Sequence, residues 1–305
     1  VIGDGSNTAV GKSLYSSYAT IPVIDFGKVS QIQEQILNEL NNKPHEAIIC
    51  SNLESVEACI GLGLPKIMPV FYMVHNCYAI FGSKGLGSEK ASRIVENSRN
   101  TGIQLLVHSP HAINVLRERD LDSKLLPMIT LLEKPKHKRK TYLLAIARYD
   151  AVKRPEVVVA LAKASKLDFV IMCGSSRQKT KWQKLCDMNK VKATIVFDVE
   201  GKEKDKLIQE AGVSIMCSEA ESFCQAIMET VTYCPTFIVN TKKISWEKNF
   251  DHLPIAKYII HRSEGDLKKA ELAKFYTEVG KEIKKAAEAE YAPRKKHAVR
   301  EQLAE

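Results

Sequence analysis

The sequence contains no apolar run that is long enough to cross a membrane, and it is poor in the residues that break regular structure. Its apolar segments, such as LLAIA at 143–147, are far shorter than the ~20 residues that a transmembrane helix needs. Only 15 glycines and 11 prolines occur among 305 residues, and 45% of the residues are hydrophobic. This composition excludes collagen-like and intrinsically disordered chains and predicts a soluble globular protein.

The sequence also lacks paired cysteines and an export signal. Its eight cysteines include no C-x-x-C pair, and several lie in apolar runs such as FVIMCG. This pattern excludes a disulfide or zinc framework and favours buried thiols in a reducing compartment. No charged and apolar leader precedes the strand-like start at Val1, so we expect a cytoplasmic protein and a few further residues upstream.

Basic residues exceed acidic ones, with 45 lysines and arginines against 36 aspartates and glutamates, which gives a formal net charge of +9. The excess favours anionic partners, whether nucleotide phosphates, nucleic acid or a membrane surface. Aromatic residues are few in the basic segments at 134–140 and 294–300, so nucleic-acid bases would find no stacking platform. We therefore expect no nucleic-acid partner and, at most, weak peripheral contact with an anionic membrane.

Short apolar, β-branched runs alternate with longer helical patterns in two consecutive series. Continuous apolar runs indicate strands buried on both faces, as in parallel sheets covered by helices. Two such series predict an α/β protein with two doubly wound, Rossmann-like sheets, whose ligands lie beyond the carboxyl ends of the strands. The expected strands lie at 1–2, 22–26, 46–51, 66–75 and 103–109 in the first series, and at 141–148, 168–174, 193–198, 212–217, 236–240 and 258–262 in the second.

A charged, proline-containing segment, KPKHKRK at 134–140, separates the two series. A chain of this length usually forms two domains of about 130 to 160 residues, and this segment has nothing to bury. We therefore predict an amino-terminal domain at 1–133, a linker at 134–140 and a carboxyl-terminal domain at 141–285; a solvated loop within one domain is the alternative. The remaining residues, 286–305, form a basic helical tail that we expect to pack back on the first domain.

The opening segment VIGDGSNTAVGKS resembles two phosphate-binding motifs without matching either. Five residues separate Gly5 from Gly11, whereas a P-loop has four, and Thr8 stands where the dinucleotide fingerprint has glycine or alanine. Asp25 has about the right spacing for a ribose hydroxyl, so an NAD-dependent enzyme remains a distant alternative. The segment predicts a glycine-containing βα loop in which Gly5 brings the backbone close to a ligand, or simply a tight turn.

The segment at 214–239 has the pattern of a buried strand, a polar loop, a helix and a second strand. Ser222 and Gln225 have the spacing of a capping box, which predicts a helix that begins near Phe223. The free amides of a first helical turn bind phosphate, and carboxylates accept hydrogen bonds from vicinal hydroxyls. Glu221 and Glu229, with seven residues between them, lie just before and within this helix and are candidates for binding a sugar or a ribose.

This segment resembles the E-x7-E signature of retaining GT-B glycosyltransferases of family four. The usual signature is P-S-x-x-E-G-F-G before the helix and G-x-P-V-I after it, and five residues of this chain fall in register: Ser218, Glu221, Phe223, Glu229 and Pro235. The resemblance implies that Glu221 contacts the transferred sugar and Glu229 the ribose of the nucleotide. It also implies that amides near Ser222, Phe223 and Cys224 hold a phosphate or the sugar.

The chain differs from this signature at several positions. Ser222 and Cys224 replace the two glycines of the E-G-F-G loop, and Cys217 replaces its proline. Side chains at these loop positions would crowd a hexose or displace the amides that hold it. A non-catalytic module that binds a nucleotide sugar or a partner protein is therefore an alternative to a transferase, and an epimerase acting on a nucleotide sugar is another.

A second segment, ARYDAVKRPEVVVALAKA at 147–164, resembles the G-R-x4-K-G sequence that opens the second domain in the same family, with alanine in place of its first glycine. Arg148 and Lys153 lie at the family's spacing, which implies that they neutralise the diphosphate; ordinary surface charges are the alternative. Gly174, in CGSS after the next strand, and His75, in FYMVHN on the acceptor side of the sugar, occupy further positions that resemble the family. The resemblance makes these four residues candidates for the site.

Together the two segments imply a GT-B glycosyltransferase whose two domains face a cleft and that moves a sugar, with retention, from a nucleoside diphosphate sugar to an acceptor. The donor base is left open, as is the acceptor, a glycan, a lipid-linked molecule or a protein. No cofactor and no metal are implied, because Arg148 and Lys153 take the part of a cation. Asp120-Leu121-Asp122 has the D-x-D spacing of a metal motif, but it lies in the charged run at 117–124, which we predict to be a solvated helix end.

Overall fold

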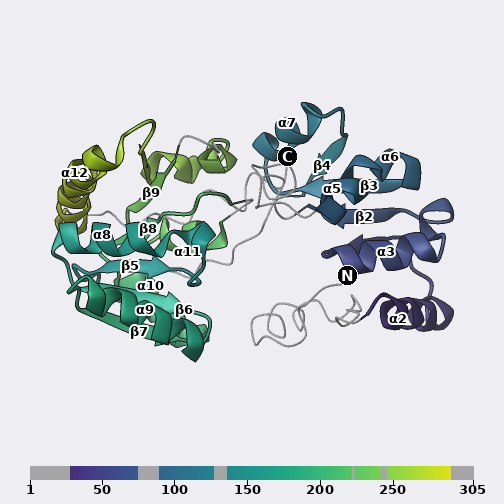
Figure 1. Cartoon of the computed structure of the whole chain (residues 1–305). Coiled ribbons are helices and arrows are strands. Elements are labelled where there is room, and N and C mark those ends of the chain that lie inside the picture. Colours follow the sequence, from purple (N-terminus) through teal and green to yellow (C-terminus); the bar gives the residue numbers. More distant parts are fainter. Residues whose placement is uncertain (1–27, 75–88, 127–135, 222–223, 242–245, 290–305) are drawn as a thin grey trace. The chain divides into compact units, whose positions relative to one another are not determined.

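The structure of the chain, a computed structural model, describes residues 28–74, 89–126, 136–221, 224–241 and 246–289. The chain divides into two compact units, Val1–Met128 and Ile129–Glu305, each with one parallel sheet covered by helices (Figure 1). No helix in the described ranges is long and apolar enough to cross a membrane. The strands expected at 1–2 and 22–26, and the tail from residue 290, lie outside these ranges.

The first unit has a four-stranded sheet within its described residues, with the order β1-β2-β3-β4 and every pair parallel. Ile36, Val56 and Leu116 from three helices pack with Val70 and Leu105 of the sheet in one core. The strands are β1 (Ile48–Cys50), β2 (Val70–Met73), β3 (Ile103–Val107) and β4 (Ser123–Leu125). The helices are α2 (Val29–Asn42), α3 (Leu53–Gly61), α5 (Glu89–Glu96), α6 (Ser98–Thr101) and α7 (Pro110–Arg117), with a 3-10 turn η1 at Leu64–Lys66.

The carboxyl end of the first unit corrects one prediction. The sequence predicts a solvated helix end at 117–124, but α7 ends at Arg117 and β4 follows as an edge strand that pairs with β3. The chain turns at Asp120, which adopts φ 56°, and Leu121 is buried. Asp122 of the D-x-D sequence is exposed, and the described residues contain no group of three or more His, Cys, Asp or Glu that could hold a metal ion.

The second unit has a six-stranded sheet in the order β10-β9-β8-β5-β6-β7, again with every pair parallel. Its strands are β5 (Leu143–Ile146), β6 (Phe169–Cys173), β7 (Ala193–Phe197), β8 (Val213–Met216), β9 (Thr236–Asn240) and β10 (Ile259–Ser263). Its helices are α8 (Pro155–Ser165), α9 (Ser176–Met188), α10 (Gly201–Glu210), α11 (Gln225–Thr230) and α12 (Lys269–Glu288), with 3-10 turns η2 (Ala151–Lys153), η3 (Trp246–Phe250) and η4 (Pro254–Tyr258). Every strand that the sequence predicts in the second series is present, which confirms the doubly wound sheet.

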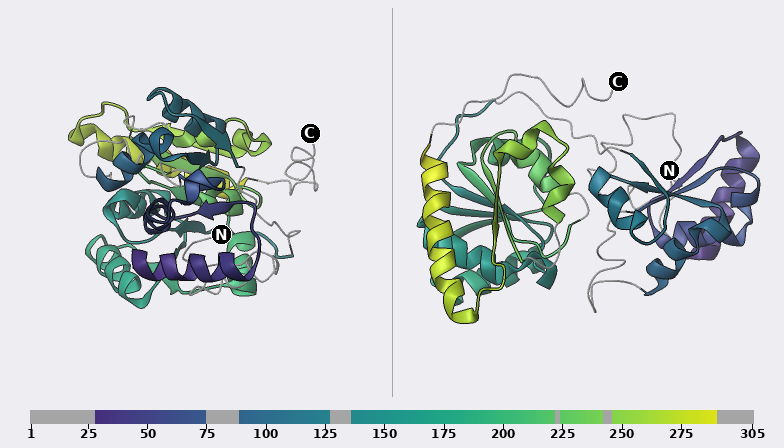
Figure 2. Two further views of the ribbon diagram at one scale, coloured as in Figure 1. Left: turned by 90° about the vertical axis from the view of Figure 1, so that its right-hand side faces the viewer. Right: turned by 90° about the horizontal axis from the view of Figure 1, so that it is seen from above.

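Helices cover both faces of this sheet, as the two views in Figure 2 show, and this explains its continuous apolar strands. Along β5, Leu143 and Ala145 belong to the core shared with α8, α9 and α12, whereas Leu144 belongs to the core shared with α10. All three side chains are fully buried. Successive side chains of a strand point to opposite faces, so a strand between two helix layers is apolar at every position.

The described part of the segment at 134–140 is bonded to the second unit. Arg139 donates hydrogen bonds to the Gly212 carbonyl, just before β8, and to the Ala286 carbonyl in the last turn of α12, at 2.7 and 2.9 Å. The last carbonyls of a helix lack partners within it, so the guanidinium binds the carboxyl end of α12. Residues 286–288 continue this helix without a break.

Helix α12 packs against α8 (Figure 1), and the two helices approach each other closely at Gly280. A Cβ atom added to Gly280 would lie 2.5 Å from the Ala164 Cβ and 2.7 Å from the Ala164 carbonyl carbon. Real Cβ atoms do not approach backbone this closely, so the helices would have to separate. Only glycine therefore permits this spacing of α8 and α12.

We expect Gly280→Ala to lower the free energy of unfolding by about 1–3 kcal/mol, because overpacking at backbone distance outweighs the ~1 kcal/mol that alanine gains over glycine in a helix. Denaturant unfolding followed by circular dichroism measures the change. The matched control is Lys281→Ala on the exposed side of the same helix, which should change stability by no more than about 0.5 kcal/mol. A Gly280→Ala protein as stable as the parent would contradict the close packing.

Candidate active site

The strand order of the second unit places a topological switch point between β5 and β8. From β5 the chain proceeds to β6 and β7 on one side of the sheet and then returns to form β8 on the other side of β5. The connections that leave β5 and β8 therefore run in opposite directions. Ligands of open α/β sheets bind outside the carboxyl ends of the strands at such a point. The loops that follow β5 and β8 are the candidate ligand-binding loops of this unit.

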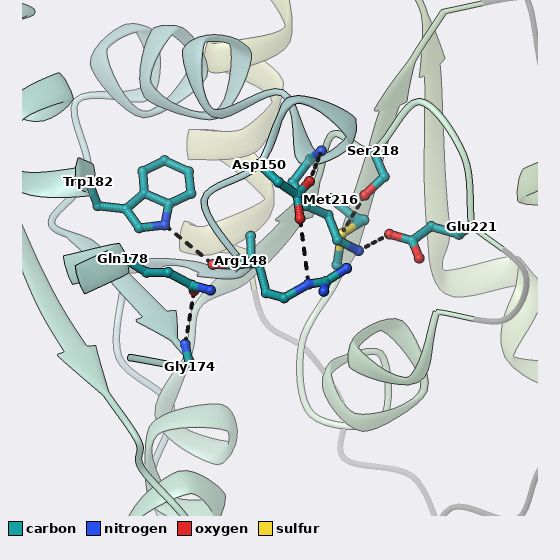
Figure 3. A network of polar contacts seen from close by, with 10 residues as sticks. Arg148, Asp150, Gly174, Gln178, Trp182, Met216, Ser218 and Glu221 are labelled. Atoms are coloured by element: carbon teal, nitrogen blue, oxygen red, sulfur yellow. Dashed lines mark hydrogen bonds and ion pairs between the residues drawn. The ribbon is translucent and has the colours of Figure 1, made fainter. Parts of the chain in front are cut away.

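The loop after β5 presents a cation to solvent. Asp150 caps the turn η2, since its Oδ1 accepts a hydrogen bond of 3.1 Å from the Lys153 backbone N–H. The other carboxylate oxygen of Asp150 lies 3.5 Å from Nε of Arg148, and the Arg148 side chain is 71% exposed. Figure 3 shows Arg148 reaching along this loop toward Asp150, with Glu221 approaching from the facing loop. Arg148 is thus a solvent-facing cation at the end of β5.

An ion pair joins the loops after β5 and β8. The ammonium of Lys153 binds the carboxylate of Glu221, and each side chain is only 14% exposed. Two further hydrogen bonds support the pairing, because the Glu219 N–H donates to the Val152 carbonyl at 2.8 Å and the Asn249 side-chain amide donates to the backbone carbonyl of Glu221 at 3.3 Å. The structure therefore brings together two of the predicted site residues, Lys153 and Glu221, directly at the switch point.

Both tryptophans of the sequence donate hydrogen bonds to backbone carbonyls at this edge of the sheet. The indole N–H of Trp182 donates to the Ala147 carbonyl, directly after β5, at 3.3 Å (Figure 3). The indole N–H of Trp246 donates to the Ser218 carbonyl, just after β8, at 2.9 Å. Both rings are fully buried. The two loops that carry Lys153 and Glu221 are therefore each fixed by a large buried side chain close to the strand end.

Glu229 forms a separate ion pair. It lies in α11, and its Oε1 is 2.8 Å from Nζ of Lys204 in α10, with side chains 17% and 24% exposed, respectively. Lys204 is not among the candidates predicted from the sequence, because nothing in the spacing of α10 marks it. The two glutamates of the E-x7-E pattern are thus each held by a lysine from another element.

Gly174 follows β6 at the same edge of the sheet. Its backbone N–H donates to Oε1 of Gln178 at 3.2 Å (Figure 3). A Cβ atom added here would meet nothing closer than the Gln178 side-chain oxygen, at 3.9 Å. The local backbone therefore does not itself require glycine at this position.

Helix α11 begins at Gln225, two residues after Phe223, and its N-cap is Cys224, whereas the capping-box pattern predicts Ser222 in that position. Cys224 has extended backbone angles, and its own side chain makes no capping hydrogen bond. Burial and the carboxylate of Glu221 raise the pKa of Cys224 to about 12, against a smaller lowering effect of Lys153. The thiol is protonated at neutral pH and is not a nucleophile. The seven described cysteines are all buried and free, which confirms the expectation of buried thiols.

Four predicted site residues lie outside the described residues. They are Gly5, His75, Ser222 and Phe223. Their roles remain predictions from the sequence. Asp150, which lies within the described residues, is not among the candidates predicted from the sequence, although an aspartate three residues before Lys153 is an N-cap signal.

Comparison with known proteins identifies the fold. No family profile and no curated protein matches the chain. Among solved structures, TarM is similar with a TM-score of 0.64 at 14% identity over 85% of this chain and 53% of TarM. Anabaena HepE in complex with UDP-glucose has a TM-score of 0.64 at 13% identity, over 92% of this chain and 81% of HepE. The α,α-trehalose 6-phosphate synthase from Burkholderia multivorans has a TM-score of 0.52 at 9% identity, over 92% of this chain and 68% of the synthase.

These similarities show that the chain has the GT-B fold, with two Rossmann-like parallel-sheet units, which confirms the fold class expected from the sequence. The chain spans about half the length of TarM, with 53% of that protein covered. At such low sequence identity the comparison establishes the fold alone. The activity is inferred from the residues of the site.

Proposed function

We propose that this protein transfers a sugar from a nucleoside diphosphate sugar to an acceptor, with retention of configuration as in the family-four enzymes that its motifs resemble. The observation that carries the proposal is the Lys153–Glu221 ion pair at the switch point between β5 and β8, with the exposed Arg148 on the same loop. The solved structures of HepE with UDP-glucose and of a TarM variant with UDP support a uridine nucleotide as the first donor to test.

The two cations, Arg148 and Lys153, are suited to stabilise a diphosphate leaving group. Negative charge grows on the diphosphate oxygen as its bond to the sugar breaks, and fixed cations that are partly removed from water stabilise this charge strongly. Lys153 is largely buried and held by the capped turn η2, while Arg148 can present its planar fork to two phosphate oxygens. Because the chain itself supplies this charge, we propose transfer that does not depend on a metal ion.

The two glutamates suit the hydroxyl groups of the donor. A carboxylate accepts hydrogen bonds from vicinal hydroxyls, and Glu221 lies beside the proposed diphosphate-binding lysine, so we assign it to the sugar. Glu229 is assigned to the ribose, with Lys204 holding its carboxylate in place. The amides at Ser222, Phe223 and Cys224 are proposed to contact the sugar or its phosphate, and His75 the acceptor side.

Donor binding is the first test. Calorimetry and thermal shift with UDP, GDP, ADP and their sugars should reveal one preferred nucleotide, because a ligand that binds only the folded state raises its melting temperature. Product analysis then separates the alternatives. A donor that binds without transfer or hydrolysis indicates a non-catalytic module, and a changed sugar without any acceptor indicates an epimerase. Failure to bind every nucleotide of this panel would contradict the proposal.

We expect Glu229→Ala to weaken donor affinity by about 1–3 kcal/mol through the loss of charge-assisted hydrogen bonds, which is about 5- to 150-fold in the dissociation constant. Calorimetric titration with the preferred donor measures it. Glu210→Ala is the matched control, since Glu210 also pairs with a lysine, Lys140 at 2.6 Å, but lies at the opposite end of α10 from the proposed site. Unchanged donor affinity in the Glu229 variant would remove this residue from the site.

A further inference from the structure

The residue after Lys153 has an unusual backbone conformation. Arg154 joins the turn η2 to helix α8 with φ 51° and ψ 60°, in the left-handed region. Residues other than glycine rarely adopt this conformation, because their Cβ atom comes too close to the following carbonyl oxygen. Arg154 also stands where the G-R-x4-K-G pattern has its last glycine. Something in the surrounding structure must therefore stabilise this conformation.

The Arg154 side chain is bound in a buried network. Its guanidinium forms an ion pair with Glu264, at the end of β10, and donates to the Val239 carbonyl in β9 at 3.4 Å. The Tyr276 hydroxyl, from α12, donates to the same Glu264 oxygen as the guanidinium, at 2.9 Å. The Arg154 and Glu264 side chains are only 10% and 8% exposed. We call Arg154, Glu264 and Tyr276 the Arg154 anchor.

Arg154 belongs to the anchor through its side chain, and its backbone directly follows the turn η2, which ends at Lys153. The Arg154 N–H donates to the Ala151 carbonyl at 3.1 Å, and the Arg154 carbonyl accepts from the Val157 N–H at 3.0 Å, so this residue both closes η2 and opens α8. A change in its backbone angles rotates Lys153, the residue before it, relative to α8. The direction of the Lys153 side chain therefore depends on what holds Arg154.

We propose that the Arg154 anchor positions Lys153 toward Glu221, and that Glu264 and Tyr276 are positioning residues for the diphosphate-binding lysine. The buried ion pair favours the left-handed conformation of Arg154, and this conformation sets the end of η2. The catalytic consequence rests on the proposed function, whereas the structural consequence does not. The two are tested by different measurements.

The structural consequence is tested by hydrogen–deuterium exchange of peptides that cover 148–156. Glu264→Gln keeps the size of the side chain and removes its charge, and it should speed exchange in this turn by about tenfold or more as local opening becomes easier. Tyr276→Phe keeps the ion pair and should increase the exchange rate of this turn by a smaller factor. It is the variant to use if Glu264→Gln is poorly folded. Exchange at the parental rate in both variants would overturn the inference.

The matched control is Glu282→Gln. Glu282 pairs with Arg262 at 2.7 Å between β10 and α12, but this pair is exposed and is not part of the Arg154 anchor. The control should leave exchange at 148–156 unchanged. An equal increase in the control would show that removing any carboxylate charge from this region has the same effect, which would also overturn the inference.

The catalytic consequence is tested by a double-mutant cycle with Lys153→Ala. Glu264→Gln should lower kcat about tenfold when Lys153 is present and less than about twofold in the Lys153→Ala background, because a residue that acts through Lys153 loses its effect with it. The donor KM should change little. An equal loss in both backgrounds would show a general effect on the fold and overturn the positioning role. If Lys153→Ala itself is fully active, Lys153 does not have its proposed catalytic role. The structural role of the anchor is then judged from the exchange data alone.

Discussion

Replacing Lys153 with alanine is expected to lower transfer turnover by about 100- to 1000-fold while leaving the fold intact. In the proposed reaction the largely buried Lys153 ammonium attracts the departing diphosphate, and this attraction is less screened by water than that of an exposed lysine. Because the charge on the diphosphate is larger in the transition state than in the bound donor, most of the loss should appear in kcat and little in the donor KM. Steady-state kinetics with the preferred donor measure both constants.

This substitution also leaves Glu221 without its partner, which must be separated from the effect on catalysis. A charged group left partly buried and unpaired destabilises a protein by about 1–3 kcal/mol. The double variant Lys153→Ala with Glu221→Gln removes both charges and should recover much of that stability without recovering turnover. Lys163→Ala, at an exposed position near the end of α8, is the control and should be fully active. Parental turnover in Lys153→Ala would exclude the proposed role.

The sequence predicts most of the fold because its strands are buried on both faces. Leu143-Leu144-Ala145 is apolar without interruption, and such runs are recognisable wherever helices cover both sides of a parallel sheet. Strand β4 has no such pattern, since Ser123-Lys124-Leu125 is partly exposed and, among the described residues, pairs with β3 alone. It is formed by pairing with β3, which local sequence does not reveal. The strand expected at 66–75 is likewise shorter, because a 3-10 turn occupies Leu64–Lys66.

The sequence points to candidate site residues but not to the contacts between them. Lys153 and Glu221 each belong to a recognisable loop motif, yet they meet only because β5 and β8 are neighbours in the sheet. Strand order is a property of the whole unit, so the spacing of 68 residues between them carries no sign of the contact. The Arg154–Glu264 pair spans 110 residues and was not anticipated for the same reason.

The second large effect is expected from Trp246→Ala, which should lower the free energy of unfolding of the second unit by about 3–5 kcal/mol. The Trp246 ring is fully buried and packs edge-on against Phe250 with ring centroids 6.3 Å apart. Its removal leaves a cavity that a small side chain cannot fill. Denaturant unfolding followed by circular dichroism measures the loss, and the fluorescence of Trp182, in the same unit, provides a second probe.

Trp246→Phe separates the packing of this ring from its hydrogen bond. Phenylalanine fills much of the space but leaves the Ser218 carbonyl, which is buried with its residue, without the indole donor, at a cost of about 1–3 kcal/mol. Since Ser218 lies three positions before Glu221, the loosened loop should also weaken binding of the donor sugar more than binding of the free nucleoside diphosphate. A Phe variant that keeps full stability and full preference for the sugar-bearing donor would show that Trp246 contributes bulk alone, and that the Glu221 loop is held by its contacts with Val152 and Lys153.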